Sequence, residues 1–394
     1  MALLSMEQQK GKPATRWVPF ALGFRPFFLL AGAAGVILML VWLMLWHGLQ
    51  EGYYGQVGWH SHEMLFGYAV GIIAGFLLTA VRNWTGIDTP VGRPLALLAL
   101  LWLAGRLMPW LPVSAWVVAC VDMAFLPMLT LALVRPLWLG ENRINRVFIP
   151  LLLSMSAANL LVHLQLLGIA TTAIQGQGLM LNLVLLLILL VAGRVLPFFT
   201  RAVIPDFQPV TRAWVEWASY LLIGLIAMAD LFSIEGAPSG MLYAVFGLVQ
   251  ALRLSGWHHL HVWKMPVQWV LHVGYLWLAA GSGLLALAEF GLFLPSAAMH
   301  AMTAGAIGIF TLGMMARVAL GHSGRSIEVV EPMTWAFVVL NLGVLMRVFG
   351  PALLPQYYLL WILLSGLLWV MAFTIFLVIY LPILLRPRVD GKPG

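Results

Sequence analysis

Residues 60–81 read HSHEMLFGYAVGIIAGFLLTAV, an apolar run that opens on two histidines and a glutamate. As an α-helix the run is long enough to cross the hydrocarbon core of a bilayer, which is about 30 Å thick. Imidazole and carboxylate groups are costly at membrane depth, so their presence there indicates a site. We therefore expect a membrane helix that carries histidines to ligate a metal or a haem, the commonest use of such groups.

The apolar character extends over all 394 residues of the chain. Hydrophobic residues make up 62% of it and charged residues only 9%, which is too little charge to cover the surface of a soluble domain. Because lipid offers the backbone no hydrogen-bond partner, apolar stretches of this length must be helical. The composition therefore predicts an all-α integral membrane protein.

The apolar stretches predict a polytopic bundle of about twelve transmembrane helices, with glycine or proline at many of the joints. No loop is long enough to fold alone, so residues 1–394 are predicted to form a single membrane domain. Its parts are a cytoplasmic N-terminal segment (1–22), the helical bundle (23–385) and a cytoplasmic tail (386–394). The predicted spans are residues 23–47, 60–81, 93–111, 113–135, 147–168, 173–196, 213–233, 238–254, 267–289, 295–317, 333–353 and 358–385.

Basic residues predict the orientation of the bundle. If both termini are cytoplasmic, all but two of the 21 Lys and Arg residues lie on the cytoplasmic side, as the positive-inside rule requires. The two exceptions are Arg106 and Arg347. Topology thus explains the net charge of +7, and because no basic face lies outside the membrane, the charge does not indicate a nucleic-acid partner.

Four of the ten histidines are predicted to lie at one depth beneath the outer face: His60, His62, His163 and His300. They come from the second, fifth and tenth spans. Residues two apart on a helix do not share a face, so His60 and His62 are expected to serve two neighbouring centres, or only one of them to ligate. Glu63 is expected to orient the His62 imidazole or to carry protons; a simple interfacial cap is the alternative.

Two further histidines, His272 and His322, are predicted near the cytoplasmic face. His300 and His322 cannot meet on one helix, because the 22 residues from one to the other span about 33 Å. If both ligate, the chain has two sites, one near each face. In that case His272 and His322 hold the second centre; otherwise they act structurally.

Arginines at the cytoplasmic edge are candidates to bind haem propionates, because a guanidinium grips a carboxylate through two hydrogen bonds. They are equally typical of positive-inside anchors. The candidates are Arg25, Arg82, Arg194, Arg201 and Arg317. The single cysteine, Cys120, rules out a Cys-x-x-Cys-His attachment, so any haem is expected to be held non-covalently.

The second and tenth spans match each other at a fixed offset of 238 residues. His62 and Gly67 correspond to His300 and Gly305, and two further glycines follow in the same register. An old duplication would explain the match, and so would ordinary helix packing through small residues.

Blocks spread along nearly the whole chain carry a family resemblance. They are LGFRPFF (22–28), WHSHEMLFG (59–67), GFLLTAVRNWTG (75–86), LHVGY (271–275), HAMT (300–303), GMMARV (313–318) and GHSGR (321–325). Together these blocks resemble the NnrS family. The resemblance implies a multi-pass protein of the bacterial inner membrane that contains haem b and copper and is linked to denitrification and to nitric-oxide stress.

The leading hypothesis is a haem–copper membrane protein that binds, reduces or otherwise relieves nitric oxide. His62 and His300 are expected to ligate metal near the outer face, with His60 and His163 completing that site or a neighbouring copper site. Glu63 is the candidate catalytic residue, as a proton relay. Electrons would arrive from a second haem or from a membrane or periplasmic donor.

The residues leave open whether the protein turns nitric oxide over. Twelve spans are typical of transporters, so a transporter or channel for metal or haem, with the histidines as its path, is one alternative. A sensor that binds haem and nitric oxide without turnover is another. A fixed, stoichiometric haem would favour the leading hypothesis, and metal movement by a colourless protein would favour the transporter.

Overall fold

The computed structural model describes residues 17–49, 52–204 and 206–392, and over these ranges it contains helices and no strands. Residues 1–16 of the predicted N-terminal segment and residues 393–394 of the predicted tail lie outside the described residues. The all-α membrane fold expected from composition is confirmed.

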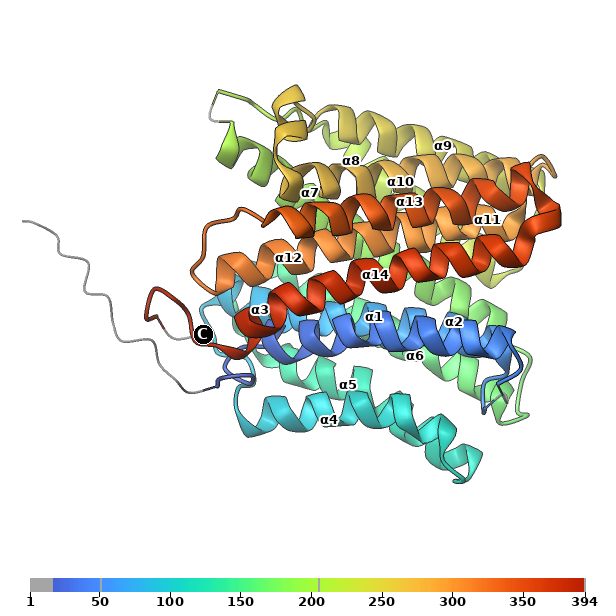
Figure 1. The fold of residues 1–394 in the computed structure, drawn as a ribbon, viewed down its shortest axis with the longest axis horizontal. Coiled ribbons are helices and arrows are strands. Elements are labelled where there is room, and N and C mark those ends of the chain that lie inside the picture. Colours follow the sequence, from blue (N-terminus) through green and yellow to red (C-terminus); the bar gives the residue numbers. More distant parts are fainter. Residues whose placement is uncertain (1–16, 50–51, 205, 393–394) are drawn as a thin grey trace, which may run out of the picture.

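Long helices run side by side along the longest axis of the molecule (Figure 1). Two of the long helices are interrupted by a π-helical segment, in which one extra residue is accommodated in each turn. The α-helices are α1 (Phe24–Trp46), α2 (Gln56–His62), α3 (Val70–Thr85), α4 (Arg93–Leu107), α5 (Ala115–Leu139), α6 (Phe148–Leu166), α7 (Ala173–Val203), α8 (Ala213–Leu231), α9 (Ala237–Ser255), α10 (Pro266–Glu289), α11 (Pro295–His300), α12 (Phe310–His322), α13 (Glu331–Leu353) and α14 (Tyr358–Leu385). The π segments are η1 (Glu63–Ala69), between α2 and α3, and η5 (Ala301–Ile309), between α11 and α12.

Ten helices in the described part of the chain are long and apolar enough to cross a membrane, counting α2–α3 and α11–α12 as one each. The other two predicted spans form α4, which has only 15 residues, and α9, which has 19 residues but is less apolar. Both pack within the bundle, α4 against α5 and α9 against α10. The chain therefore has a multi-pass membrane architecture, and the count of twelve spans stays a prediction.

The two ends of the described chain lie at the same end of the bundle. The backbone N–H of Val18 donates a hydrogen bond to the carbonyl oxygen of Leu385 at 2.9 Å, and α1 packs along α14. Figure 1 shows the C-terminus at the end opposite to α2 and α11. The helices that carry the predicted outer histidines thus begin at the far end from the termini.

Three helical units form the centre of the bundle: α2–α3, α7 and α11–α12. α7 contacts both π segments, and α12 contacts α3. In the most apolar stretch of residues 56–85, 89% of the residues are buried inside the protein. The corresponding share is 83% for residues 295–322 and only 28% for α8 at the periphery. The second and tenth helical units are therefore the most buried, and α7 packs against the π segments of both.

The correspondence between the second and tenth spans extends to the backbone. η1 begins directly after His62 and η5 directly after His300, so the two π segments start at the same 238-residue offset. π segments occur mostly at functional sites, because they rotate the side chains that follow. The match between the two inner helices therefore includes the π segment in each of them.

Gly274 of α10 provides a test of the close packing between α10 and the inner helix. A Cβ at this position would lie 2.8 Å from the backbone nitrogen of Phe310, which cannot move aside. We expect Gly274→Ala to destabilise the protein by about 1–3 kcal/mol. Thermal unfolding in detergent would show this as a lower midpoint.

The matched control is Gly283→Ala in the same helix, where an added Cβ meets nothing within 4 Å. This variant should unfold at the same temperature as the natural protein or higher, because alanine favours a helix over glycine by about 1 kcal/mol. Equal behaviour of the two variants would contradict the packing described for α10.

Candidate functional site

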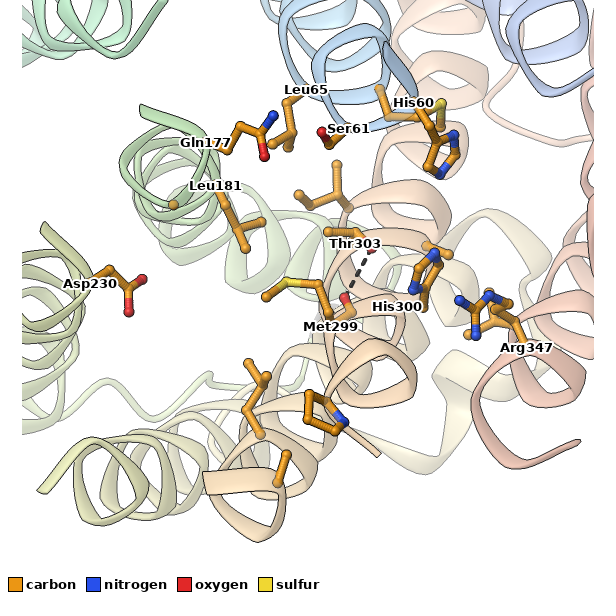
Figure 2. A pocket seen from close by; sticks show the side chains of 18 of the residues that line it. His60, Ser61, Leu65, Gln177, Leu181, Asp230, Met299, His300, Thr303 and Arg347 are labelled. Atoms are coloured by element: carbon orange, nitrogen blue, oxygen red, sulfur yellow. Dashed lines mark hydrogen bonds between the residues drawn. The ribbon is translucent and has the colours of Figure 1, made fainter. Parts of the chain in front are cut away.

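A cavity of about 830 Å³ lies between the inner helices and their neighbours. Ligand pockets typically measure about 300–1,000 Å³, so it could take a large organic ligand. Most of the lining side chains are apolar. The titratable ones include His60 of α2, His300 of α11, Arg347 of α13 and Glu289 of α10. Asp230 of α8 lies on the wall opposite to His300 (Figure 2).

His60 and His300 face each other across one side of this cavity. Their ring centroids are 6.3 Å apart and their ring planes differ by only 9°. Trp42 of α1 stacks on His60 with a centroid distance of 4.2 Å. The Nδ1 of His300 lies 2.7 Å from the carbonyl oxygen of Ser296, so Nδ1 is the protonated nitrogen and Nε2 carries a free lone pair.

The distance between these two ring centroids is that of two imidazoles that share one metal ion. A metal–nitrogen bond is about 2 Å long, so two imidazoles on opposite sides of one ion have centroids about 6 Å apart. Nδ1 of His300 donates to a backbone carbonyl, as the outer nitrogen of a metal-bound imidazole usually does. The volume and the apolar walls of the cavity suit a haem, which His60 and His300 could hold.

A second cluster, on the other side of α2, is fully buried. Its centre is Asp122 of α5, whose Oδ2 lies 3.0 Å from Nε2 of His163 and 3.2 Å from Nε2 of His62. Asn159 donates a hydrogen bond to the same oxygen at 2.8 Å. One ligand atom from each of the two imidazoles and the carboxylate lies within 4.8 Å of the others, so these three side chains could hold a metal ion.

Arg106 links this cluster to Glu63. Its guanidinium donates one hydrogen bond to Asp122 and another to Oε2 of Glu63 at 3.1 Å. Two carboxylates and one guanidinium leave the cluster with one net negative charge when the imidazoles are neutral. A bound cation or a proton would balance that charge, which is costly to leave uncompensated in a buried setting.

The ring nitrogens that point away from Asp122 differ in their surroundings. Nδ1 of His163 lies 3.2 Å from the hydroxyl of Tyr53, a partner of the kind that fixes the ring orientation of a histidine ligand. Nδ1 of His62 lies 3.6 Å from Oε1 of Glu63, beyond hydrogen-bond distance, and neither atom has a hydrogen-bond partner among the described residues. The cluster combines two imidazoles and one carboxylate, a donor set that suits copper or zinc.

The structure sorts the four predicted outer histidines into two pairs. His60 pairs with His300 and His62 pairs with His163, while His62 and His300 do not share a site. Glu63 faces Arg106 and His62 and is not among the residues that line the cavity. The two pairs lie on opposite faces of α2.

The predicted cytoplasmic histidines lie apart from each other. Nδ1 of His272 is 3.0 Å from the carbonyl oxygen of Gln268, and the ring of His322 packs 5.9 Å from that of Phe24. No contact among the described residues joins these two histidines. A second centre made by both of them stays a prediction.

The five predicted propionate arginines do not line the cavity. Most of them contact other protein groups: Arg25 donates to the carbonyl oxygens of Leu384 and Arg386, Arg82 pairs with Asp88, Arg194 bonds to Asn145, Arg317 lies over the ring of Phe199, and Arg201 is exposed. The arginine that does line the cavity is Arg347.

Sequence reasoning did not assign Arg106, Asp122, Asn159 or Arg347 to a site. A signal existed for both arginines, because they are the two basic residues that break the positive-inside pattern. Asp122 also had a sequence signal, because it is a carboxylate in the middle of an apolar span. Asn159 had no such signal, because an uncharged asparagine does not stand out in a membrane helix.

Asp122 is predicted to be the residue on which the buried cluster depends. Asp122→Asn should destabilise the protein by about 3–5 kcal/mol, because it leaves Arg106 with one counter-charge and places an amide among hydrogen-bond donors. Thermal unfolding in detergent measures the effect.

Asp88→Asn removes the same charge from an exposed pair with Arg82 and should cost less than about 1 kcal/mol. A similar loss of stability in the two variants would argue against a special role for the buried carboxylate.

Comparison with protein families gives a match to the NnrS protein family over residues 18–388, nearly the whole chain. No curated protein sequence matches the chain.

Proposed function

The chain belongs to the NnrS family, and from this premise we propose that it is a haem-binding protein of the bacterial inner membrane that takes nitric oxide into the cavity between His60 and His300. Family membership links the chain to the response to nitric oxide, and its apolar helices make it a multi-pass membrane protein. The observation that carries the proposal is the pair of near-parallel imidazoles 6.3 Å apart at the edge of an apolar cavity.

The two imidazoles have different supports. His300 is oriented by its hydrogen bond to the carbonyl of Ser296, which also raises the basicity of Nε2. His60 makes no hydrogen bond with any described residue and rests on the ring of Trp42. When bound, the haem would supply an iron that carries electrons, or that takes nitric oxide at the position His60 would vacate. We expect His300 to be the firmer ligand and His60 the more mobile one.

The copper expected of the family is proposed for the cluster of His62, Asp122 and His163. Two imidazoles and a carboxylate are suitable copper ligands, and the net negative charge of the cluster favours a cation. Glu63, whose Oε1 lies 3.6 Å from Nδ1 of His62, is proposed as the proton relay beside this site.

The test measures haem and copper in the purified protein and in single variants. The natural protein from haem-replete cells should hold haem with the spectrum of two axial imidazoles. His60→Ala and His300→Ala should lose the haem or that spectrum, and both should keep copper. His163→Ala should lose copper and keep haem, because His163 lies outside the cavity.

His261→Ala is the matched control, since His261 is exposed on a short 3₁₀ helix (Leu260–Lys264) and its ring contacts neither pair. It should keep both cofactors. Haem content that is unchanged in both His60→Ala and His300→Ala would contradict the proposal. A colourless natural protein that moves metal or haem across vesicles would favour the transporter instead.

Turnover is tested separately, with a nitric-oxide electrode and a chemical reductant. Consumption of nitric oxide beyond one molecule per haem would identify a reductase. Binding that stops at one molecule per haem would identify a sensor or a carrier.

A further inference from the structure

Arg347 is a cation placed inside the cavity, next to His300 (Figure 2). Its Nη2 donates a hydrogen bond to the hydroxyl of Ser296 at 2.9 Å, and its guanidinium carbon lies 5.9 Å from the ring centroid of Tyr358. Its Nη1 is buried and has no hydrogen-bond partner among the described residues. One side of the guanidinium is therefore held in place while the other has an unused donor.

Three carboxylates line the same cavity: Asp230 and Glu289, which bond to other groups, and the exposed Glu235. Asp230 lies on the opposite wall and accepts a hydrogen bond from Asn182 at 2.6 Å. Glu289 accepts one from the backbone N–H of Gly236 at 2.7 Å. No carboxylate of the described residues forms an ion pair with Arg347, and no other lysine or arginine lines the cavity.

A charged guanidinium without a counter-ion is costly away from water, and the cost falls when an anion binds beside it. In the orientation predicted from the basic residues, Arg347 also lies near the membrane face at which the positive-inside rule disfavours arginine. Position and the buried, unpartnered Nη1 thus indicate that the charge is kept for a ligand. A guanidinium binds carboxylates and other planar oxyanions through paired hydrogen bonds.

Ser296 connects this cation to the proposed axial ligand. Its carbonyl oxygen accepts from Nδ1 of His300, and its hydroxyl accepts from Arg347. One residue at the start of α11 thus fixes both side chains relative to each other. A ligand that bound to both side chains would need a metal ion for His300 and a carboxylate for Arg347 on the same molecule. Haem carries both groups.

We propose that Arg347 and Ser296 form an anion subsite of the cavity, and that this subsite binds a propionate carboxylate of the haem held by His300. The inference rests on the proposed function for the haem itself. A free oxyanion such as nitrite has the same chemistry and is the other source of the anion. The experiment separates the two sources.

The test compares haem with haem dimethyl ester, in which both carboxylates are blocked. Full-length protein is purified from haem-deficient cells and titrated with each compound, and binding is followed by the haem absorption band. The natural protein should bind haem about tenfold or more tightly than the ester, because the ester cannot make the charge-assisted hydrogen bonds. Arg347→Gln should remove this preference, and Arg347→Lys should keep part of it.

Two controls separate a local effect from a loss of fold. Arg82→Gln replaces an arginine outside the cavity and should keep the full preference for haem over its ester. Ser296→Ala leaves the backbone carbonyl in place for His300 and removes only the hydroxyl that holds Arg347, so it should weaken the preference while the bis-imidazole spectrum persists.

A second arm titrates the haem-free protein with nitrite by calorimetry. The natural protein could bind haem and its ester equally and also bind nitrite in a way that Arg347→Gln abolishes. That result would support the anion subsite with a free oxyanion as its occupant. An unchanged preference for haem over ester in Arg347→Gln, with no nitrite binding that depends on Arg347, would overturn the subsite. Haem that binds normally to His300→Ala would instead overturn the proposed function, and the nitrite arm would still decide the subsite.

Discussion

The hydrocarbon of a membrane offers no hydrogen-bond partner, so each polar group inside the bundle must find one within the protein. Asp122 shows how far this constraint reaches. Its single carboxylate accepts hydrogen bonds from Arg106 of α4 and from Asn159 and His163 of α6. Arg106 in turn bonds to Glu63 of η1. Four helical elements are thus held together by one buried charge network, and the orientation of the inner helix follows from it.

That orientation places two neighbouring sites on one helix. With Glu63 and His62 turned toward the charge network, His60 on the other face of α2 is directed at the cavity. The tenth helical unit meets it there with His300, and both units continue as π segments from the same relative position. The two sites are therefore adjacent parts of one structure, joined through less than a turn of helix.

The amino-acid sequence predicted much of the fold but only part of the site. Apolar composition determines that the chain is helical and membrane-spanning, because lipid leaves the backbone no other solution. Helix direction and length predict the depth of the histidines. Their pairing did not, since it depends on how each helix is rotated about its axis, and packing decides that. A π segment rotates the residues that follow it and has no sequence signal of its own. Arg106 and Arg347 were visible as exceptions to the charge pattern, but their partners come from other helices.

The proposed function depends most on His60 and His300 together holding one haem iron. Electron paramagnetic resonance of the oxidised, purified protein tests it directly, because the signal of a low-spin ferric haem reports the number of imidazole ligands and the angle between their planes. With ring planes 9° apart, the account predicts a rhombic low-spin signal that disappears in His60→Ala. A signal from high-spin iron alone, or a low-spin signal that is unchanged in His60→Ala, would contradict it.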